Sequence, residues 1–281
     1  MIHEVSNPFF SEIASGVLAA AENHDRMVMI ANTRRDPEQE IRYVAEMRAM
    51  RVQALLLAGS EFVDDHAKQR LDVELDKYAS MGGRVVLMRP HPSRMVVMPD
   101  TTQGGRLMAE HLIGLGHRQI GVVTGPEQLA TIRDRLRAFE SRLAEDGIEI
   151  VHVVSADFSR EGGYAGTRHL LQSYPEVTAL FALNDLMGVG AIHAAHDLGL
   201  RVPDDISVAG FNDLPSARDV TPPLTTIRLP LRQMGERALE VALGDGVDVE
   251  EPVVLDVELV ARPSTGPPRR HTGDRRATFK L

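Results

Sequence analysis

Residues 120–154 read IGVVTGPEQLATIRDRLRAFESRLAEDGIEIVHVV. The runs Ile120–Thr124 and Ile150–Val154 are continuous and apolar rather than strictly alternating, which is typical of strands buried on both faces of a parallel sheet. The stretch between them, Ile132–Asp146, has helical periodicity and ends at Gly147, the residue type expected after a helix C-terminus. This segment is therefore predicted to form a strand, a helix and a second, parallel strand.

The same alternation continues in both directions along the chain. Further strand candidates are the short runs Met27–Ala31, Ala54–Ala58, Arg84–Met88, Met95–Met98, Ala179–Ala182, Ile206–Gly210 and Val253–Val260. Further predicted helices are Ser11–Asn23 with a Ser N-cap, a helix that begins at Pro37, and Thr102–Leu115, Arg160–Leu171, Asp185–Leu198 and Leu231–Leu243. So regular a series predicts an α/β fold of two units, roughly 1–117 and 118–226, with parallel sheets covered by helices on both faces. The segment after Ile227 is expected to cross back and complete them.

The composition excludes several classes of protein. The 281 residues include 31 Lys+Arg against 40 Asp+Glu, a formal charge of −9, which argues against this chain gripping nucleic acid by itself. The absence of Cys removes disulfide scaffolds, thiol catalysis and thiolate zinc sites. No run approaches the ~20 apolar residues that a membrane span needs. The first positive charge is Arg26, so the start does not resemble a secretory leader, and we expect a cytoplasmic protein.

Motifs of enzymes are absent from the sequence. No lysine follows a glycine in a phosphate-binding loop, because the chain's lysines are Lys68, Lys77 and Lys280, and there is no GxSxG elbow for a hydrolase serine. His193 and His196 are three residues apart on a predicted helix and could share a metal ion, but no carboxylate stands at a helpful spacing. We therefore predict a binding protein with no metal and no cofactor rather than an enzyme.

Polar and aromatic side chains follow the predicted strands, where a cleft between two sheets would present them. They are Phe9 and Phe10 before the first helix, then Asp100, Thr131, Arg135, Phe158, Asn184, Asp185, Asn212 and Asp213. Aromatic faces cover the C–H side of a sugar, while amides, carboxylates and an arginine fix its hydroxyls. Taken singly, Asn184 and Asp185 could be helix caps and Phe158 could be core. Taken together, the set favours a site for a small polyhydroxylated ligand.

At these residues the sequence resembles the effector-binding core of the LacI-type transcriptional regulators, the family of the lactose and purine repressors. The matching segments occur in family order over about residues 5–265 and are Asn7–Ile13, His111–Ile120, Gly125-Pro126 with Arg135–Phe139, Asp157–Ser159 with Gly163-Tyr164, Asn184–Gly188, Gly199–Ile206, Gly210–Asp213 and Pro222–Ile227. The resemblance implies a periplasmic-binding-protein-like type I fold: two three-layer lobes with parallel sheets, joined by crossover strands. The implied N-terminal lobe is 1–117 plus 228–254, the C-terminal lobe is 118–227 plus 255–265, and 266–281 is a basic tail expected to be disordered.

The resemblance also implies a site. Phe9 or Phe10 would line the N-lobe side, Phe158 would supply the opposing stacking face, and Asp100, Thr131 and Arg135 would hydrogen-bond the effector. Asn184 and Asn212 or Asp213 match the polar pair at the end of the C-lobe sheet. Two departures bear on which ligand the site selects: Asn212 stands where the lactose and purine repressors carry an acid, and Leu229 replaces a frequent glutamine.

The implied function is that of a repressor core. A sugar-like effector would control operator binding by favouring one arrangement of the lobes, and the core would form a homodimer through helices of the N-lobe. Operator DNA would be reached only through a helix-turn-helix headpiece, which family members carry before the first strand and which this sequence lacks, as Met1 already stands at the end of that strand. The alternatives are a solute-binding protein of a sugar transporter with the same fold and, more distantly, an enzyme on this fold.

Overall fold

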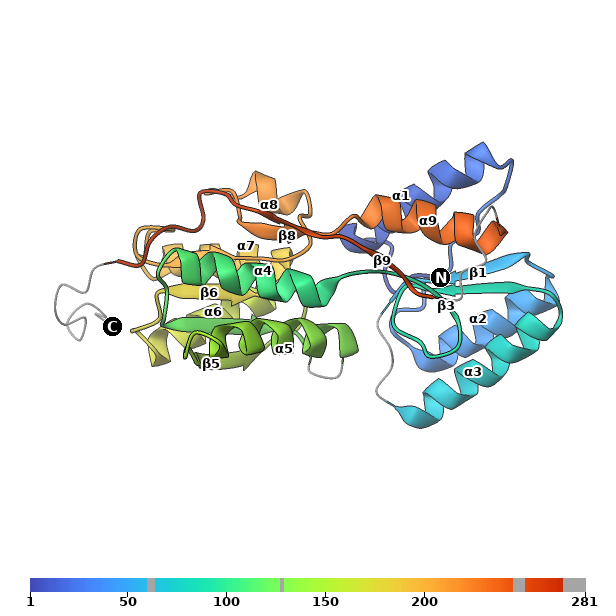
Figure 1. Cartoon of the computed structure of the whole chain (residues 1–281), viewed down its shortest axis with the longest axis horizontal. Helices are drawn as coiled ribbons and strands as arrows, with labels where there is room; N and C mark the ends of the chain where they lie inside the picture. The colour runs from blue at the N-terminus through green and yellow to red at the C-terminus, as the bar shows by residue number, and fades with distance from the viewer. Residues whose placement is uncertain (60–63, 127–128, 245–250, 270–281) are drawn as a thin grey trace. The chain divides into compact units, whose positions relative to one another are not determined.

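A computed structural model describes residues 1–59, 64–126, 129–244 and 251–269, which form two compact units (Figure 1). Unit 1 consists of Met1–Asp100, Gln128–Thr131 and Pro230–Val257, and unit 2 of Thr101–Glu127, Ile132–Leu229 and Glu258–Leu281. The chain therefore passes between the units several times, and one passage out of unit 2 lies between Leu229 and Pro230. The lobe boundaries predicted from the sequence stay a prediction beside this division.

Unit 1 is built on a four-stranded sheet in the order β1-β2-β3-β9, with every neighbouring pair parallel. The strands are β1 (Ala54–Leu57), β2 (Arg84–Leu87), β3 (Met95–Pro99) and β9 (Val253–Leu255). Helices α1 (Pro8–Asn23) and α9 (Leu231–Leu243) cover one face, and α2 (Pro37–Ala49) and α3 (Asp65–Ser80) cover the other (Figure 1). One core of buried side chains, including Val44, Leu57, Leu75 and Leu87, fills the space between the sheet and α2 and α3.

Unit 2 repeats this plan with the sheet order β5-β4-β6-β7, again with all neighbours parallel. Its strands are β4 (Ile120–Thr124), β5 (Ile150–Ser155), β6 (Ala179–Ala182) and β7 (Ser207–Ala209), and its helices are α4 (Thr101–Gly114), α5 (Ala130–Ala144), α6 (Arg160–Ser173), α7 (Asp185–Asp197) and the short α8 (Ser216–Asp219). A separate antiparallel pair joins β8 (Thr226–Arg228) to β10 (Glu258–Val260). These two strands adjoin the passages of the chain between the units.

The helices pack closely because glycines stand at their contacts. A Cβ atom on Gly190 of α7 would lie 2.0 Å from the carbonyl oxygen of Arg160 in α6, and one on Gly163 of α6 would lie 2.4 Å from the Met187 backbone. In unit 1, a Cβ on Gly16 of α1 would collide with the backbone of α9, and a Cβ on Gly235 of α9 would collide with the backbone of α1. The backbones therefore approach to a distance that no other residue type allows.

The α/β class and the alternating order of elements are confirmed, but several details of the sequence prediction are wrong. Helix α1 begins at Pro8 rather than Ser11, and Asn7 caps it by accepting a hydrogen bond from the Phe9 N–H. Helix α3, capped by Asp64, was not among the predicted helices. The run Val253–Val260 is two strands in different sheets, because a two-residue break separates β9 from β10.

The predicted strand Met27–Ala31 is also not a strand. Its flank meets only the short segment Met1–Ile2: the Ile2 N–H donates to Ala31 at 2.9 Å, while the Met1 ammonium donates to Leu56 of β1 at 2.6 Å. The rest of the segment runs beside an apolar groove whose other walls come from β1, α1 and α9, and Met27 is 98% exposed. A β-branched or apolar run forms a strand only where a neighbouring backbone bonds with it, and the hydrogen bond to Ala31 lies at the very end of this run.

In the described part of the chain, no helix combines the length and apolar character needed to cross a membrane. Of the predicted tail, 270–281 lie outside the described residues, while the Gly266 N–H donates to Ser207 Oγ at 3.0 Å and so ties the start of the tail to β7.

Candidate ligand-binding site

Arg135 is a buried cation at the carboxyl end of the unit 2 sheet. Helix α5 carries it, it is 5% exposed, and its guanidinium donates to the carbonyl oxygen of Leu183, just after β6. The guanidinium carbon lies 3.5 Å from the centre of the Phe211 ring, and Nε has no hydrogen-bond partner among the described residues. Burial lowers the pKa of Arg135 to about 9, with the negative charge of Asp185 acting in the opposite direction. The guanidinium is thus held by one ring and one carbonyl, and it stays charged at neutral pH.

Phe158 and Asn184 lie together at the same edge. Asn184 caps α7: its Oδ1 accepts from the Met187 N–H at 2.7 Å, and its Nδ2 donates to the carbonyl oxygen of Phe158 at 3.4 Å. The half-buried Phe158 ring sits directly on Gly125, where a Cβ would come within 2.4 Å of the ring. The hydrogen bond from Asn184 and the contact with Gly125 together position the Phe158 ring at the end of β4.

Asn212 belongs to the turn that follows β7. Its backbone has a φ of 118°, and the next residue, Asp213, has a φ of 58°. The Asn212 N–H donates to Ile227 at 2.8 Å, so the turn is bonded along β8, while Asn212 Oδ1 has no hydrogen-bond partner among the described residues. A buried carbonyl oxygen without a donor is costly, so this atom suits a ligand that donates a hydrogen bond.

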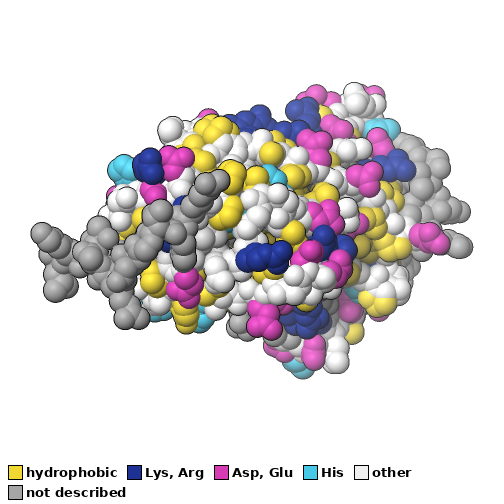
Figure 2. Space-filling model, turned by 60° about the vertical axis from the view of Figure 1, so that its left-hand side comes forward, with side chains coloured by type: hydrophobic (Ala, Val, Ile, Leu, Met, Phe, Trp, Pro, Cys, Tyr) yellow, Lys and Arg dark blue, Asp and Glu magenta, His cyan; other side chains and the backbone are white. Residues whose placement is uncertain are grey.

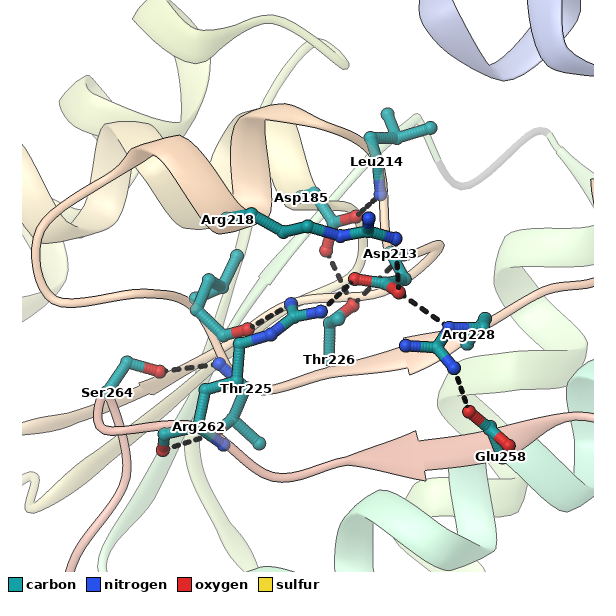
Figure 3. Close-up of polar contacts among 11 residues, drawn as sticks. Asp185, Asp213, Leu214, Arg218, Thr225, Thr226, Arg228, Glu258, Arg262 and Ser264 are labelled. Atoms are coloured by element: carbon teal, nitrogen blue, oxygen red, sulfur yellow. Dashed lines mark hydrogen bonds and ion pairs between the residues drawn. The ribbon is translucent and has the colours of Figure 1, made fainter.

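Asp213 is surrounded by arginines from three elements (Figure 3). Its Oδ2 accepts from Arg228 Nε of β8 at 2.7 Å and from Arg218 Nη2 of α8 at 3.3 Å, and its Oδ1 accepts from Arg262, which follows β10. Burial alone would raise the pKa of Asp213, but the hydrogen bonds from Arg228 and Arg262 outweigh it and lower the pKa. The carboxylate therefore remains ionised and fully engaged.

Asp185 is a second buried acid in this network (Figure 3). Its carboxylate accepts from the Leu214 N–H and from Thr226 Oγ1, each at 2.6 Å. Burial raises the pKa of Asp185 to about 6, although both hydrogen bonds act in the opposite direction. The sequence left this residue as a possible helix cap; in the structure Asn184 is the cap of α7, and Asp185 instead holds the turn after Asp213.

Arg135, Phe158, Asn184, Asn212 and Asp213 lie in unit 2, but the four other predicted residues belong to unit 1. Phe10 is 5% exposed and packs edge-on against the rings of His3 and Phe9, while Phe9 itself is half-buried. Asp100 follows β3, and its N–H donates to Leu255 at 2.9 Å. The side chain of Thr131 lies outside the described residues.

Sequence reasoning missed the arginines around Asp213. Arg228 ends the apolar run of β8, and Arg262 comes two residues after β10. A cation next to buried strand residues is the signal that points to an ion pair, since such a charge is rarely buried without a partner. The sequence could not name that partner, because Asp213 is 49 positions away from Arg262.

The histidine pair considered as a metal site has a different neighbour. Arg160 Nη2 lies 2.7 Å from His193 Nδ1, and burial together with this positive charge lowers the pKa of His193. A guanidinium in that place repels a metal cation. Within the described ranges, no group of three or more metal-ligating side chains occurs.

Comparison with known proteins agrees with this geometry. Residues 109–265 match the family model described as a periplasmic binding protein-like domain. The chain is 32% identical over 265 residues to the HTH-type transcriptional repressor PurR of Haemophilus influenzae (strain PittEE), an alignment that covers 92% of this chain and 77% of that protein. It superimposes on a dimeric Lac repressor with a TM-score of 0.85 and 26% identity over 95% of this chain and 98% of the other. The chain belongs to the LacI family of transcriptional regulators.

A further LacI family regulator, from Enterococcus faecium and solved with bound ribose, has a TM-score of 0.82 and 26% identity over 95% of this chain and 98% of its own. The LacI-family chain is accordingly a ligand-binding regulatory core with a periplasmic-binding-protein-like fold. Its relatives named here are transcriptional regulators and not enzymes.

Proposed function

We propose that this LacI-family core binds a small sugar or sugar-like effector and that the bound effector controls operator binding in the intact repressor. The observation that carries the proposal is that three groups stand at the carboxyl end of the unit 2 sheet. The Arg135 guanidinium donates to Leu183 after β6, the Phe158 ring lies on Gly125 after β4, and the buried Oδ1 of Asn212, after β7, has no hydrogen-bond partner among the described residues. A ring face with a donor and an acceptor beside it suits the C–H and O–H groups of a sugar. The ribose-bound relative supports this class of ligand.

Each predicted site residue other than Asp213 has a role in this proposal. Phe158 covers the apolar face of the ligand, Arg135 donates to its oxygens, and Asn184 and Asn212 bind its hydroxyls. Phe9, Phe10, Asp100 and Thr131 contribute to binding the same effector, as the family resemblance implies. The effector acts only through its different affinity for two arrangements of the protein.

The core acts on DNA as a homodimer and through a separate headpiece, in the cytoplasm where operators are found. On the face drawn in Figure 2, the basic side chains of the described residues stand among acidic ones rather than in a continuous stripe. The ion pairs show the same mixing of charges, since Arg142 of α5 pairs with Glu110 and Asp146. Charges so neutralised do not grip a phosphate backbone, so DNA affinity requires the headpiece.

A thermal-shift screen with D-ribose, other sugars, nucleosides and purine bases tests the proposal. At a hundredfold excess over Kd, an effector stabilises the folded state by about 2.7 kcal/mol, and the melting temperature rises by about 5 °C or more. Arg135→Ala is expected to weaken binding at least tenfold by isothermal calorimetry, because the hydroxyl acceptors lose their donor. Arg142→Ala, a change of the same residue type on the same helix, is expected to bind as the wild type does. Equal affinity of the Arg135→Ala protein contradicts the role given to Arg135.

A further inference from the structure

Asp213 is the predicted site residue that is least able to meet a ligand. Its side chain is 1% exposed, against 43% for Arg228 and 62% for Arg218, which approach it from outside. Both carboxylate oxygens already accept hydrogen bonds from arginines. An effector that touched this carboxylate would have to displace charged donors, and buried pairs of that kind are expensive to break.

Two of the arginines that hold Asp213 come from the segments that adjoin the passages between the units: Arg228 is the last residue of β8, and Arg262 comes two residues after β10. Arg228 comes one residue before Leu229, where the chain leaves unit 2, and it also pairs with Glu258, the first residue after the chain returns. Arg262 follows β10, donates a second hydrogen bond to Leu224 at 2.8 Å and lies alongside Thr225. The Asp213 carboxylate thus joins the turn after β7 to both β8 and β10 (Figure 3).

The turn that carries Asn212 needs such support. Two successive residues other than glycine, Asn212 and Asp213, have positive φ, a conformation that is unfavourable for an L-residue and persists only where the surroundings impose it. The Asn212 N–H bonds to Ile227, and the Leu214 N–H bonds to Asp185. Between these two backbone contacts, the side chain of Asp213 makes the strongest contacts of the turn, since they are charge-assisted.

We propose that Asp213 is a positioning residue and not an effector contact: clamped by Arg228 and Arg262, it holds the 212–213 turn in its left-handed conformation and so presents Asn212 to the effector. The inference rests on the proposed function, in which Asn212 binds the effector. According to this inference, the affinity lost when Asp213 is changed is lost through Asn212, and that dependence can be measured.

A double-mutant cycle separates the two roles. D-ribose and the other compounds of the panel are titrated into the wild type, Asp213→Asn, Asn212→Ala and the double variant, at least 15 °C below the lowest melting temperature. We expect each single change to weaken binding about tenfold and the double variant to bind no more than twofold worse than Asn212→Ala, because Asp213 acts only through Asn212. Additive losses, about a hundredfold in the double variant, would show a direct contact. Affinity within twofold in Asp213→Asn would show a purely structural role, and either result overturns the proposal.

A second measurement needs no ligand. Hydrogen exchange of the Asn212, Leu214 and Leu229 amides in the ligand-free protein is expected to be at least tenfold faster in Asp213→Asn, while the amides of β4 exchange as before. Asp205→Asn, which alters an exposed ion pair with Arg201, is the matched control and should leave the turn unchanged. Unchanged exchange at the turn refutes the positioning role whatever the ligand is.

Two further arms keep the result interpretable. If Asp213→Asn fails to fold, Arg228→Gln takes its place, since Arg228 is half-exposed; it should weaken binding about threefold with the same lack of additivity toward Asn212→Ala, and additivity refutes the proposal. If no compound of the panel binds the wild type but exchange at the turn accelerates as expected, the proposed effector class fails and the positioning of the turn stands.

Discussion

Asp185 and Asp213 are two buried acids whose surroundings shift their pKa values in opposite directions. Asp185 is 0% exposed and receives two neutral hydrogen bonds, so burial dominates and its pKa rises to about 6. Asp213, which is also buried, receives charged donors and its pKa falls. The kind of donor that each buried acid meets therefore decides whether its pKa rises or falls.

The pH dependence of stability should carry the signature of Asp185. Because its pKa is about 6 in the folded protein and 3.8 in the reference state, the folded state binds the extra proton between these values. Its contribution is therefore fully present below about pH 4 and lost as pH rises through about 6. Urea unfolding gives the free energy of unfolding of the wild type and of Asp185→Asn. The difference between them, wild type minus variant, should fall by at most about 3 kcal/mol between pH 4 and 7. A difference that is flat over this range would contradict the assignment.

At the level of helices and strands, close helix packing sets tight limits on substitution. Gly190→Ala should lower the melting temperature by several degrees, because the new methyl group would lie 2.0 Å from the Arg160 carbonyl oxygen and α6 and α7 would have to separate. Gly114→Ala in α4 is the matched control: nothing lies within 4 Å of its Cβ position, so stability should hold or rise slightly. Thermal unfolding followed by circular dichroism measures both, and equal melting temperatures would refute the packing argument.

The elements that the sequence predicted well are those whose signal is local. Ile120–Thr124 and Ala179–Ala182 were placed to the residue, since continuous apolar runs between helices have few other uses in an α/β protein. Met27–Ala31 is equally apolar but forms no strand, because strand pairing depends on a neighbouring backbone that is far away in the sequence. For the same reason the sequence proposes strand-end residues for the site but not Arg228 and Arg262, whose ion pairs arise only from the tertiary fold.

On the scale of the whole molecule, the exposed apolar side chains are unevenly distributed. The large hydrophobic residues that are exposed within the described chain, among them Leu18 of α1, Val73 of α3 and Met81, lie in unit 1. Apolar side chains gathered on a water-exposed surface mark interaction sites. This supports the dimerisation through N-terminal helices that the proposed function includes.

Sedimentation velocity should show a dimer of about 62 kDa, twice the 30.9 kDa of one chain. The double change Leu18→Lys and Met29→Lys, at exposed positions of α1 and of the segment that follows it, is expected to shift the species toward the monomer, because two charges would be buried without partners. Ala144→Lys, on an exposed position of α5 in unit 2, serves as the control and should sediment as the wild type does. An unchanged dimer in the double variant would place the interface elsewhere.

The enclosed first residue has a practical consequence for handling the protein. The Met1 ammonium donates into the edge of β1, and burial lowers the pKa of this group to about 6. Residues joined to Met1, whether of a tag or of another segment, therefore begin at the edge of β1 and beside the apolar groove. The sequence of such a tag, and whether it is cleaved, therefore becomes a variable in every stability or binding experiment, and preparations that differ in it are different proteins.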